Sequence, residues 1–170
     1  FICLAAAAIF TACGAEPKQE SDTTTEEIVK PWSLTFETYE AVEDSCEMPQ
    51  CTFIEITRPI VAGGRPAAEK KINAFVDSLY RTSIKMQMPE GMGNQSYERM
   101  CDAFIEGYEL FTMEFPDSPQ KWEYMMTAES SALLDDYFTM VVNTESYLGG
   151  AHPNSQFVAA TFDLETGNEV

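Results

Sequence analysis

Residues 147–170, YLGGAHPNSQFVAATFDLETGNEV, carry the features that define the fold of this chain most clearly. They include the single His of the sequence, a Gly-Gly pair, an apolar run and a turn signal. Residues 156–164 predict a strand, and residues 165–168 (ETGN) predict a hairpin turn with Gly at the left-handed position. The sequence stops at Val170, so we expect a hairpin that lacks its return strand, in a chain clipped at both ends.

The segments before this stretch alternate between strand and helix patterns. Residues 32–39, 52–56, 122–128 and 138–144 show period-two alternation or are rich in β-branched and aromatic side chains, which predicts strands. Pro66 and an apolar stripe predict an amphipathic helix over about residues 66–85, and Ser96 can cap a second helix with its apolar face from Tyr97 to Phe111. This order predicts an α+β fold, with a largely antiparallel sheet and two amphipathic helices packed on one face.

The N-terminal residues predict an exported, lipid-anchored protein. Residues 1–12 are apolar and uncharged and are typical of a secretory signal peptide that is clipped at its N-terminus. Phe10-Thr11-Ala12-Cys13 is similar to a bacterial lipobox, in which Cys13 receives the lipid. An ordinary signal peptide with an incidental Cys is the alternative. Residues 13–31 predict a flexible acidic tether, and residues 32–170 a C-terminally incomplete domain.

The predicted signal peptide and the lipid on Cys13 predict a location in the cell envelope. We expect it outside the cytoplasm, held by its lipid to a membrane, with the outer membrane or the periplasmic face as the location.

The chain is strongly acidic, with a formal net charge of −18 at pH 7. The last basic residue is Lys121, and eight Asp or Glu residues follow it. Such a surface repels phosphate backbones and anionic lipid head groups. We therefore do not expect the protein to bind nucleic acid. The charge suits a basic partner, and simple solubility is the alternative explanation.

Three cysteines remain after Cys3 leaves with the signal and Cys13 takes the lipid. Cys46 and Cys51 bracket a four-residue turn, so we predict a local disulfide between them in an oxidising compartment. Cys101 would then be a buried free thiol on a helix. A zinc site is not expected, because no CxxC motif and no second His accompany these residues.

Two motifs resemble a known family. Residues 53–61 (FIEITRPIV), followed by a helix with Ile72-Asn73, resemble the N-terminal half of the PdaC/RsiV-like extracytoplasmic domain family. Residues 147–153 (YLGGAHP), followed by residues 162–167 (FDLETG), resemble its C-terminal half, in which a Gly-Gly-Ala-His segment and an Asp-Leu-x-Thr-Gly turn are the marks. Together the two halves would cover residues 33–170.

The resemblance implies an α+β domain with a binding or accessory role. One relative is a lysozyme-binding, membrane-held anti-sigma factor, and another is a peptidoglycan deacetylase that carries this module before a separate catalytic domain. No catalytic residue is carried over from the family. A deacetylase of that zinc-dependent kind needs more than one His ligand. This sequence contains a single His, so we do not expect that activity in it.

His152 is the sharpest candidate for chemistry. It could act as a general base or bind a metal together with carboxylates, but Gly149, Gly150 and Pro153 around it predict a tight turn. A structural or recognition role is therefore the favoured interpretation. We predict a recognition loop, with these residues: Tyr147, Gly149, Gly150, His152 and Asn154.

The sequence thus favours a non-catalytic recognition module for a lysozyme-like protein or a peptidoglycan fragment, partners that rest on the resemblance. No cofactor, metal or catalytic residue is predicted. The alternatives are a metal-assisted hydrolase centred on His152 and an accessory domain of a larger peptidoglycan-modifying enzyme.

Overall fold

The computed structural model describes residues 30–44, 46–47, 50–86, 94–117 and 120–170. The predicted signal peptide, Cys13 and the tether up to residue 29 lie outside this part. The described elements are strands β1 (Lys30–Val42) and β2 (Phe53–Gly64), helices α1 (Pro66–Lys85) and α2 (Tyr97–Glu114), and strands β3 (Trp122–Leu133), β4 (Tyr137–Leu148) and β5 (Asn154–Asp163). Both helices begin where the sequence predicts, and Ser96 caps α2 by accepting a hydrogen bond from the Arg99 N–H.

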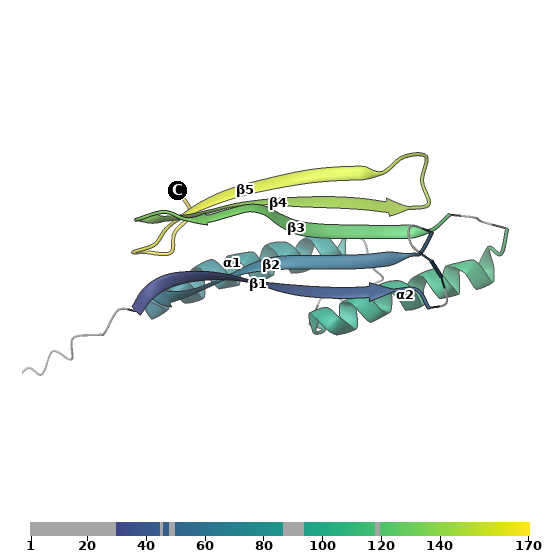
Figure 1. Cartoon of the computed structure of the whole chain (residues 1–170), viewed down its shortest axis with the longest axis horizontal. Coiled ribbons are helices and arrows are strands. Elements are labelled where there is room, and N and C mark those ends of the chain that lie inside the picture. The colour runs from purple at the N-terminus through teal and green to yellow at the C-terminus, as the bar shows by residue number, and fades with distance from the viewer. Residues whose placement is uncertain (1–29, 45, 48–49, 87–93, 118–119) are drawn as a thin grey trace, which may run out of the picture.

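The strands form one mixed sheet in the order β1-β2-β3-β4-β5. The pairs β1–β2, β3–β4 and β4–β5 are antiparallel, whereas β2 and β3 are parallel. The α+β class is therefore confirmed, but the prediction of a largely antiparallel sheet is wrong. The reason is the connection: α1 and α2 carry the chain back to the end where β2 began, so that β3 runs in the same direction as β2 (Figure 1).

The hydrophobic core lies between the sheet and the two helices, which Figure 1 shows on one face of the sheet. The predicted apolar stripe of α1 is buried at Ala68, Ile72 and Val76, and Tyr80 and Ile84 continue it. The sheet contributes alternate side chains from its central strands, as period-two alternation requires. These are Ile54 and Ile56 from β2, Tyr124 and Met126 from β3, and Phe138, Met140 and Val142 from β4.

The parallel pairing between β2 and β3 is short. It runs from Phe53 opposite Glu123 to Thr57 opposite Thr127, and it ends there although β2 continues to Gly64. The backbone edge of β2 that faced β3 is thus left without a strand partner over its second half. Buried backbone groups need hydrogen-bond partners, so this edge must be satisfied in another way.

Side chains of α1 supply the missing partners. The Tyr80 hydroxyl donates to the Thr57 carbonyl oxygen at 2.8 Å. The Asn73 side chain bonds the backbone of Val61 twice, because its amide donates to the carbonyl oxygen at 2.6 Å and its oxygen accepts from the N–H at 3.1 Å. The Gly63 N–H donates to Glu69 at 2.9 Å. Since residues 69, 73 and 80 lie on one side of a helix, α1 acts as a substitute for a neighbouring strand.

This arrangement also explains how β2 runs through Pro59. Backbone groups of every second residue in a strand point to the same edge, so the nitrogen of Pro59 faces the same edge as the N–H of Val61. Proline has no N–H to donate and is tolerated where a strand has no strand neighbour. The sequence reading ended the strand at Ile56, whereas β2 extends through Pro59 to Gly64.

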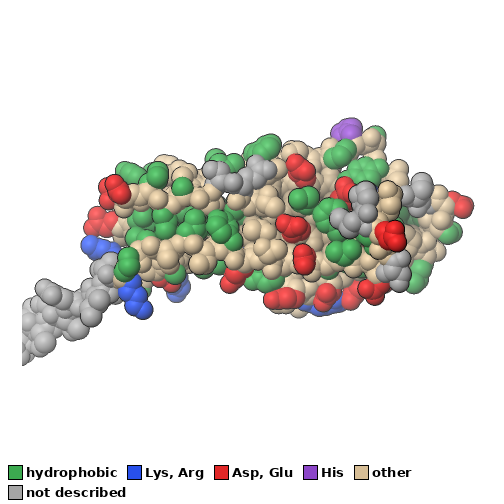
Figure 2. All heavy atoms as spheres, in the orientation of Figure 1, with side chains coloured by type: hydrophobic (Ala, Val, Ile, Leu, Met, Phe, Trp, Pro, Cys, Tyr) green, Lys and Arg blue, Asp and Glu red, His purple; other side chains and the backbone are tan. Residues whose placement is uncertain are grey.

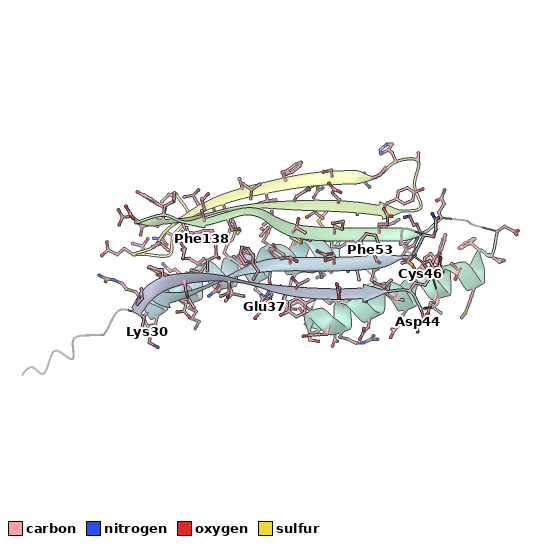
Figure 3. The ribbon with its side chains drawn as sticks, in the orientation of Figure 1. Lys30, Glu37, Asp44, Cys46, Phe53 and Phe138 are labelled. Atoms are coloured by element: carbon pink, nitrogen blue, oxygen red, sulfur yellow. A yellow bond between two sulfur atoms is a disulfide. The ribbon has the colours of Figure 1, made fainter. Side chains whose placement is uncertain are left out.

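A second polar cluster ties the first two strands to both helices. Arg58 of β2 contacts Glu37 of β1 at 2.9 Å and Asp77 of α1 at 3.1 Å. The Tyr97 hydroxyl at the start of α2 donates to Asp77 at 3.0 Å, and the Arg58 guanidinium lies 4.8 Å from the centre of the Tyr97 ring. Figure 3 shows Glu37 midway along β1. The cluster therefore ties α1 and α2 to each other and to β1 and β2.

We predict that Asn73→Ala lowers the free energy of unfolding by about 2–4 kcal/mol, because it leaves two backbone groups of the buried Val61 without partners. Urea unfolding followed by circular dichroism measures the change. The matched control is Asn94→Ala at an exposed position, which we expect to change stability by no more than about 0.5 kcal/mol. Equal stabilities of the two variants would contradict the role assigned to Asn73.

The carboxylates of the Arg58 cluster predict a loss of stability in acid. Hydrogen bonds from Tyr39 and Arg58 lower the pKa of Glu37. Burial by itself would raise the pKa of Asp77, but the bonds from Arg81 and Tyr97 and the nearby positive charges together bring it below the usual value. A lowered folded-state pKa means that the stabilisation is present above the unfolded-state pKa of about 4 and is lost as the pH falls below it.

Urea unfolding at pH 7 and pH 3 should therefore show that Asp77→Asn costs stability at pH 7 and less at pH 3, because the carboxyl group of the unfolded chain is mostly protonated below about pH 4. A cost that does not change with pH would show that the charge of Asp77 is not the stabilising feature.

Candidate recognition surface

Several connections meet at one end of the molecule. β1 ends there, β2, β3 and β5 begin there, and the C-terminal end of α2 projects beyond the sheet (Figure 1). The β4–β5 turn, residues 149–153, lies at the same end. In Figure 3, Asp44 and Cys46 mark this end and Phe138 marks the opposite one. The predicted recognition loop thus belongs to a surface built from distant parts of the sequence.

The predicted disulfide between Cys46 and Cys51 is confirmed and closes the β1–β2 connection. A backbone hydrogen bond closes the same connection, because the Glu43 N–H donates to the Thr52 carbonyl oxygen at 2.9 Å. These two residues lie just outside the segment that the disulfide spans. Cys101 is a buried free thiol on α2, as expected, and burial raises the pKa of this thiol to about 12. A thiol with such a pKa stays protonated and unreactive at neutral pH.

The predicted recognition loop is partly strand and partly turn. Tyr147 belongs to β4, where it pairs with Glu123, and Asn154 begins β5 opposite Ser146. Gly149 starts the turn with a φ of 84°, and an added Cβ there would lie 2.8 Å from the side-chain oxygen of Gln120. The turn therefore needs Gly149 for both its backbone conformation and its contact with the segment before β3.

His152 is exposed at the tip of this turn, and Figure 2 shows its ring protruding from the surface. Its Nδ1 atom lies 3.1 Å from the carbonyl oxygen of the next residue, Pro153. Among the described residues, no group of three or more His, Cys, Asp or Glu is placed to hold a metal ion. The described surroundings of His152 are those of a surface side chain that is available for contact with a partner.

Aromatic packing joins the turn to the end of α2. Trp122 pairs with Leu148, the last residue of β4, and its ring lies 5.7 Å from Tyr108 and 5.3 Å from Phe111. Trp122 therefore connects the second half of α2 with the end of β4, which the β4–β5 turn follows. Sequence reasoning identified the turn but not the helix, although Leu110 and Met113 fall outside the predicted buried face of α2 and could have indicated it.

The opposite end of the molecule has an open hollow of about 450 Å³. Its lining combines aromatic, acidic and basic side chains, among them Trp32, Arg65, Asp135, Asp136, Tyr137 and Glu165. Arg65 and Glu165 form an exposed ion pair at 3.1 Å across its rim. Mixed charges and partial internal pairing favour a solvated surface hollow over a specific site.

The predicted turn after β5 borders this hollow and is confirmed. Asp163 accepts hydrogen bonds from the N–H and the hydroxyl of Thr166, which lower the pKa of its carboxyl group. Gly167 has a φ of 69°, and an added Cβ would lie 2.7 Å from the backbone of Ala68 in α1. The chain then turns back along β5, where the Val170 N–H donates to the Thr161 carbonyl oxygen. These motif residues hold the turn against α1.

Comparison with known families gives one match. A family model described as "Deacetylase PdaC" covers residues 45–155, more than half of the chain. The chain belongs to the PdaC family. No protein of established annotation matches the PdaC-family chain. The matched range stops before the turn at Asp163–Gly167, so the RsiV-like nature of the C-terminal half stays a prediction.

Solved structures of the DUF3298 family resemble this fold. A protein from Pseudomonas aeruginosa PAO1 has 15% sequence identity and a TM-score of 0.51, with 85% of this chain and 57% of the other covered. One from Bacteroides fragilis NCTC 9343 has 12% identity and a TM-score of 0.50, with 84% and 60% covered. These identities show the shared fold alone. The PdaC-family chain spans less than two thirds of the length of either protein.

Neither α1 nor α2, the two described helices, is long and apolar enough to cross a bilayer. The predicted lipid on Cys13 lies outside the described residues and stays a prediction.

The β4–β5 turn provides a paired test of backbone geometry. Gly149→Ala should destabilise the domain by about 1–2 kcal/mol, because L-residues are strained at positive φ. Gly150→Ala is the matched control, since its Cβ would find only the His152 carbonyl oxygen at 3.9 Å. Thermal unfolding of both variants measures the effect. Equal melting temperatures would show that the turn tolerates a side chain at Gly149.

Proposed function

We propose that this PdaC-family domain is a lipid-anchored, extracytoplasmic recognition module that binds a basic protein of the lysozyme-like kind without catalysing a reaction. The observation that carries the proposal is the excess of negative charge, with 28 Asp and Glu residues against 10 Lys and Arg. A protein surface with this balance attracts cationic partners and increases their association rates.

The distribution of ion pairs supports a protein partner. Five of the ten basic side chains form described ion pairs with carboxylates, as in Arg58 with Glu37 and Arg99 with Glu106. The carboxylates that exceed them on the surface provide the binding charge. An acidic surface has less to offer an uncharged glycan strand, so a basic protein is the better partner on electrostatic grounds.

The β4–β5 turn is the proposed contact loop. The chain is exposed from Gly150 through the turn into the start of β5 at Phe157, and Gly149, at positive φ, packs too close to Gln120 to accept a side chain. A loop that is held in one conformation loses little conformational entropy on binding. His152 and Asn154 then offer hydrogen-bonding groups that a partner can reach.

Calorimetric titration of the soluble domain with a lysozyme of positive net charge tests this proposal. We expect saturable binding that weakens on the order of tenfold between 50 and 200 mM salt, because the attraction is electrostatic. The double variant His152→Ala/Asn154→Ala should weaken binding and leave the melting temperature unchanged. Asn94→Ala, an exposed Asn outside the loop, serves as the control.

Absence of heat with the lysozyme would reject the proposal. Binding of peptidoglycan fragments in a parallel titration would instead assign the domain to wall recognition or to an accessory role beside a wall-modifying enzyme. Hydrolysis of those fragments that His152→Ala abolishes would establish the hydrolase alternative.

A further inference from the structure

The second half of α2 exposes large apolar side chains to solvent. Leu110 is 67% exposed, Met113 is 77% exposed, and Phe115, just after the helix, is 50% exposed. Leu110 and Met113 are three residues apart and therefore lie on one side of the helix. Adjacent exposed apolar side chains of this size are typical of a surface that binds a partner.

Two glutamates frame these apolar residues in an unfavourable position. Glu109 lies four residues before Met113, and Glu114 lies four residues after Leu110, so both border the apolar stripe. The C-terminal end of a helix is the negative end of its dipole and favours cations, yet the last turn of α2 contains no basic residue. Glu106, by comparison, is paired with Arg99 at 2.7 Å.

A shallow hollow of about 300 Å³ extends this surface toward the end of β1. Its lining combines apolar residues, among them Ala41 and Ile105, with the acidic residues Asp44, Asp102 and Glu109. The surface thus combines apolar contact area with carboxylates along one side of α2. Figure 2 shows acidic and hydrophobic side chains close together at the end of the molecule that carries His152.

We propose that this surface, which we call the α2 face and define by Glu109, Leu110, Met113, Glu114 and Phe115, is the docking site for a basic protein segment. The inference rests on the proposed function and specifies where its partner binds. Aliphatic side chains of the partner cover Leu110 and Met113, and its Lys or Arg side chains meet Glu109 and Glu114.

Charge complementarity selects this occupant. A second copy of the chain would bring a further net charge of −18 to the interface and would be repelled. An anionic membrane surface would be repelled by the same glutamates. The positive charge of a cationic segment offsets the unfavourable interaction of Glu114 with the helix dipole. Its apolar side chains at the same time bury the exposed apolar area of α2.

The first test uses a probe that does not depend on the identity of the partner. An amphipathic helical peptide made of Lys and Leu is titrated into the isotopically labelled domain, with a Glu-Leu peptide of equal length as the control. We expect the Lys-Leu peptide to shift the amide resonances of residues 105–115 and 148–153, and the Glu-Leu peptide to shift none. Shifts confined to other parts of the chain, or no shifts, would overturn the proposal.

The second test separates the apolar and charged parts of the α2 face. Leu110→Ser/Met113→Ser should weaken peptide binding at least about tenfold, because it removes the exposed anchors. Leu134→Ser is the matched control, since Leu134 is 56% exposed in the turn before β4, at the opposite end of the molecule. Equal binding by the two variants would overturn the proposal.

The double variant Glu109→Gln/Glu114→Gln distinguishes a docking role of these glutamates from a structural one, because a docking role predicts opposite effects on stability and on binding. We expect it to raise the melting temperature, because it removes negative charge from the negative end of α2, and to weaken peptide binding with a smaller salt dependence. A variant that is stabilised and binds as well as the wild type would contradict the docking role of these glutamates.

The same variants are then titrated with the lysozyme. If the lysozyme binds the wild type and all α2-face variants equally, the docking site is wrong while the proposed function stands. If the peptide binds at the α2 face and the lysozyme does not bind, the docking site stands and the lysozyme-like partner is wrong.

Discussion

The hydrogen bonds between α1 and the freed edge of β2 are the interaction on which the rest of this structure depends. β2 pairs with β3 as far as Thr57 and then continues without a strand neighbour, so its buried backbone would be costly to leave unpaired. Asn73, Tyr80 and Glu69 satisfy these groups from one side of α1. These hydrogen bonds fix α1 along β2, and the bond from the Tyr97 hydroxyl to Asp77 links α2 to α1.

This constraint also gives a physical meaning to the sequence features that mark the family resemblance. In the Ile72-Asn73 pair, Ile72 enters the core while Asn73 bonds the backbone of Val61. Gly167 allows the turn after β5 to approach the backbone of Ala68 at the start of α1. Both features serve to place α1. These two marks of the family, Asn73 and Gly167, therefore maintain the fold.

The two ends of the molecule differ in how far their side chains bond to one another within the protein. Near the turn after β5, polar groups largely satisfy one another, as in the contacts of Lys71 with Thr166 and Asn168. At the other end, apolar side chains of α2 stay exposed, and the β4–β5 turn follows Leu148, which pairs with Trp122. Exposed groups on a fixed scaffold are suited to recognition, since little rearrangement is needed on binding.

The sequence by itself determined the class of the fold, the bounds of α1, the start of α2, the disulfide between Cys46 and Cys51 and the turn at Gly167. These features depend on local patterns: apolar periodicity, helix capping, short Cys spacing and the backbone freedom of Gly. The tertiary structure decided the parallel pairing of β2 with β3, the passage of β2 through Pro59, and the packing of Trp122 against α2 next to the end of β4. Each of these depends on contacts between residues far apart in the chain, which local patterns do not encode.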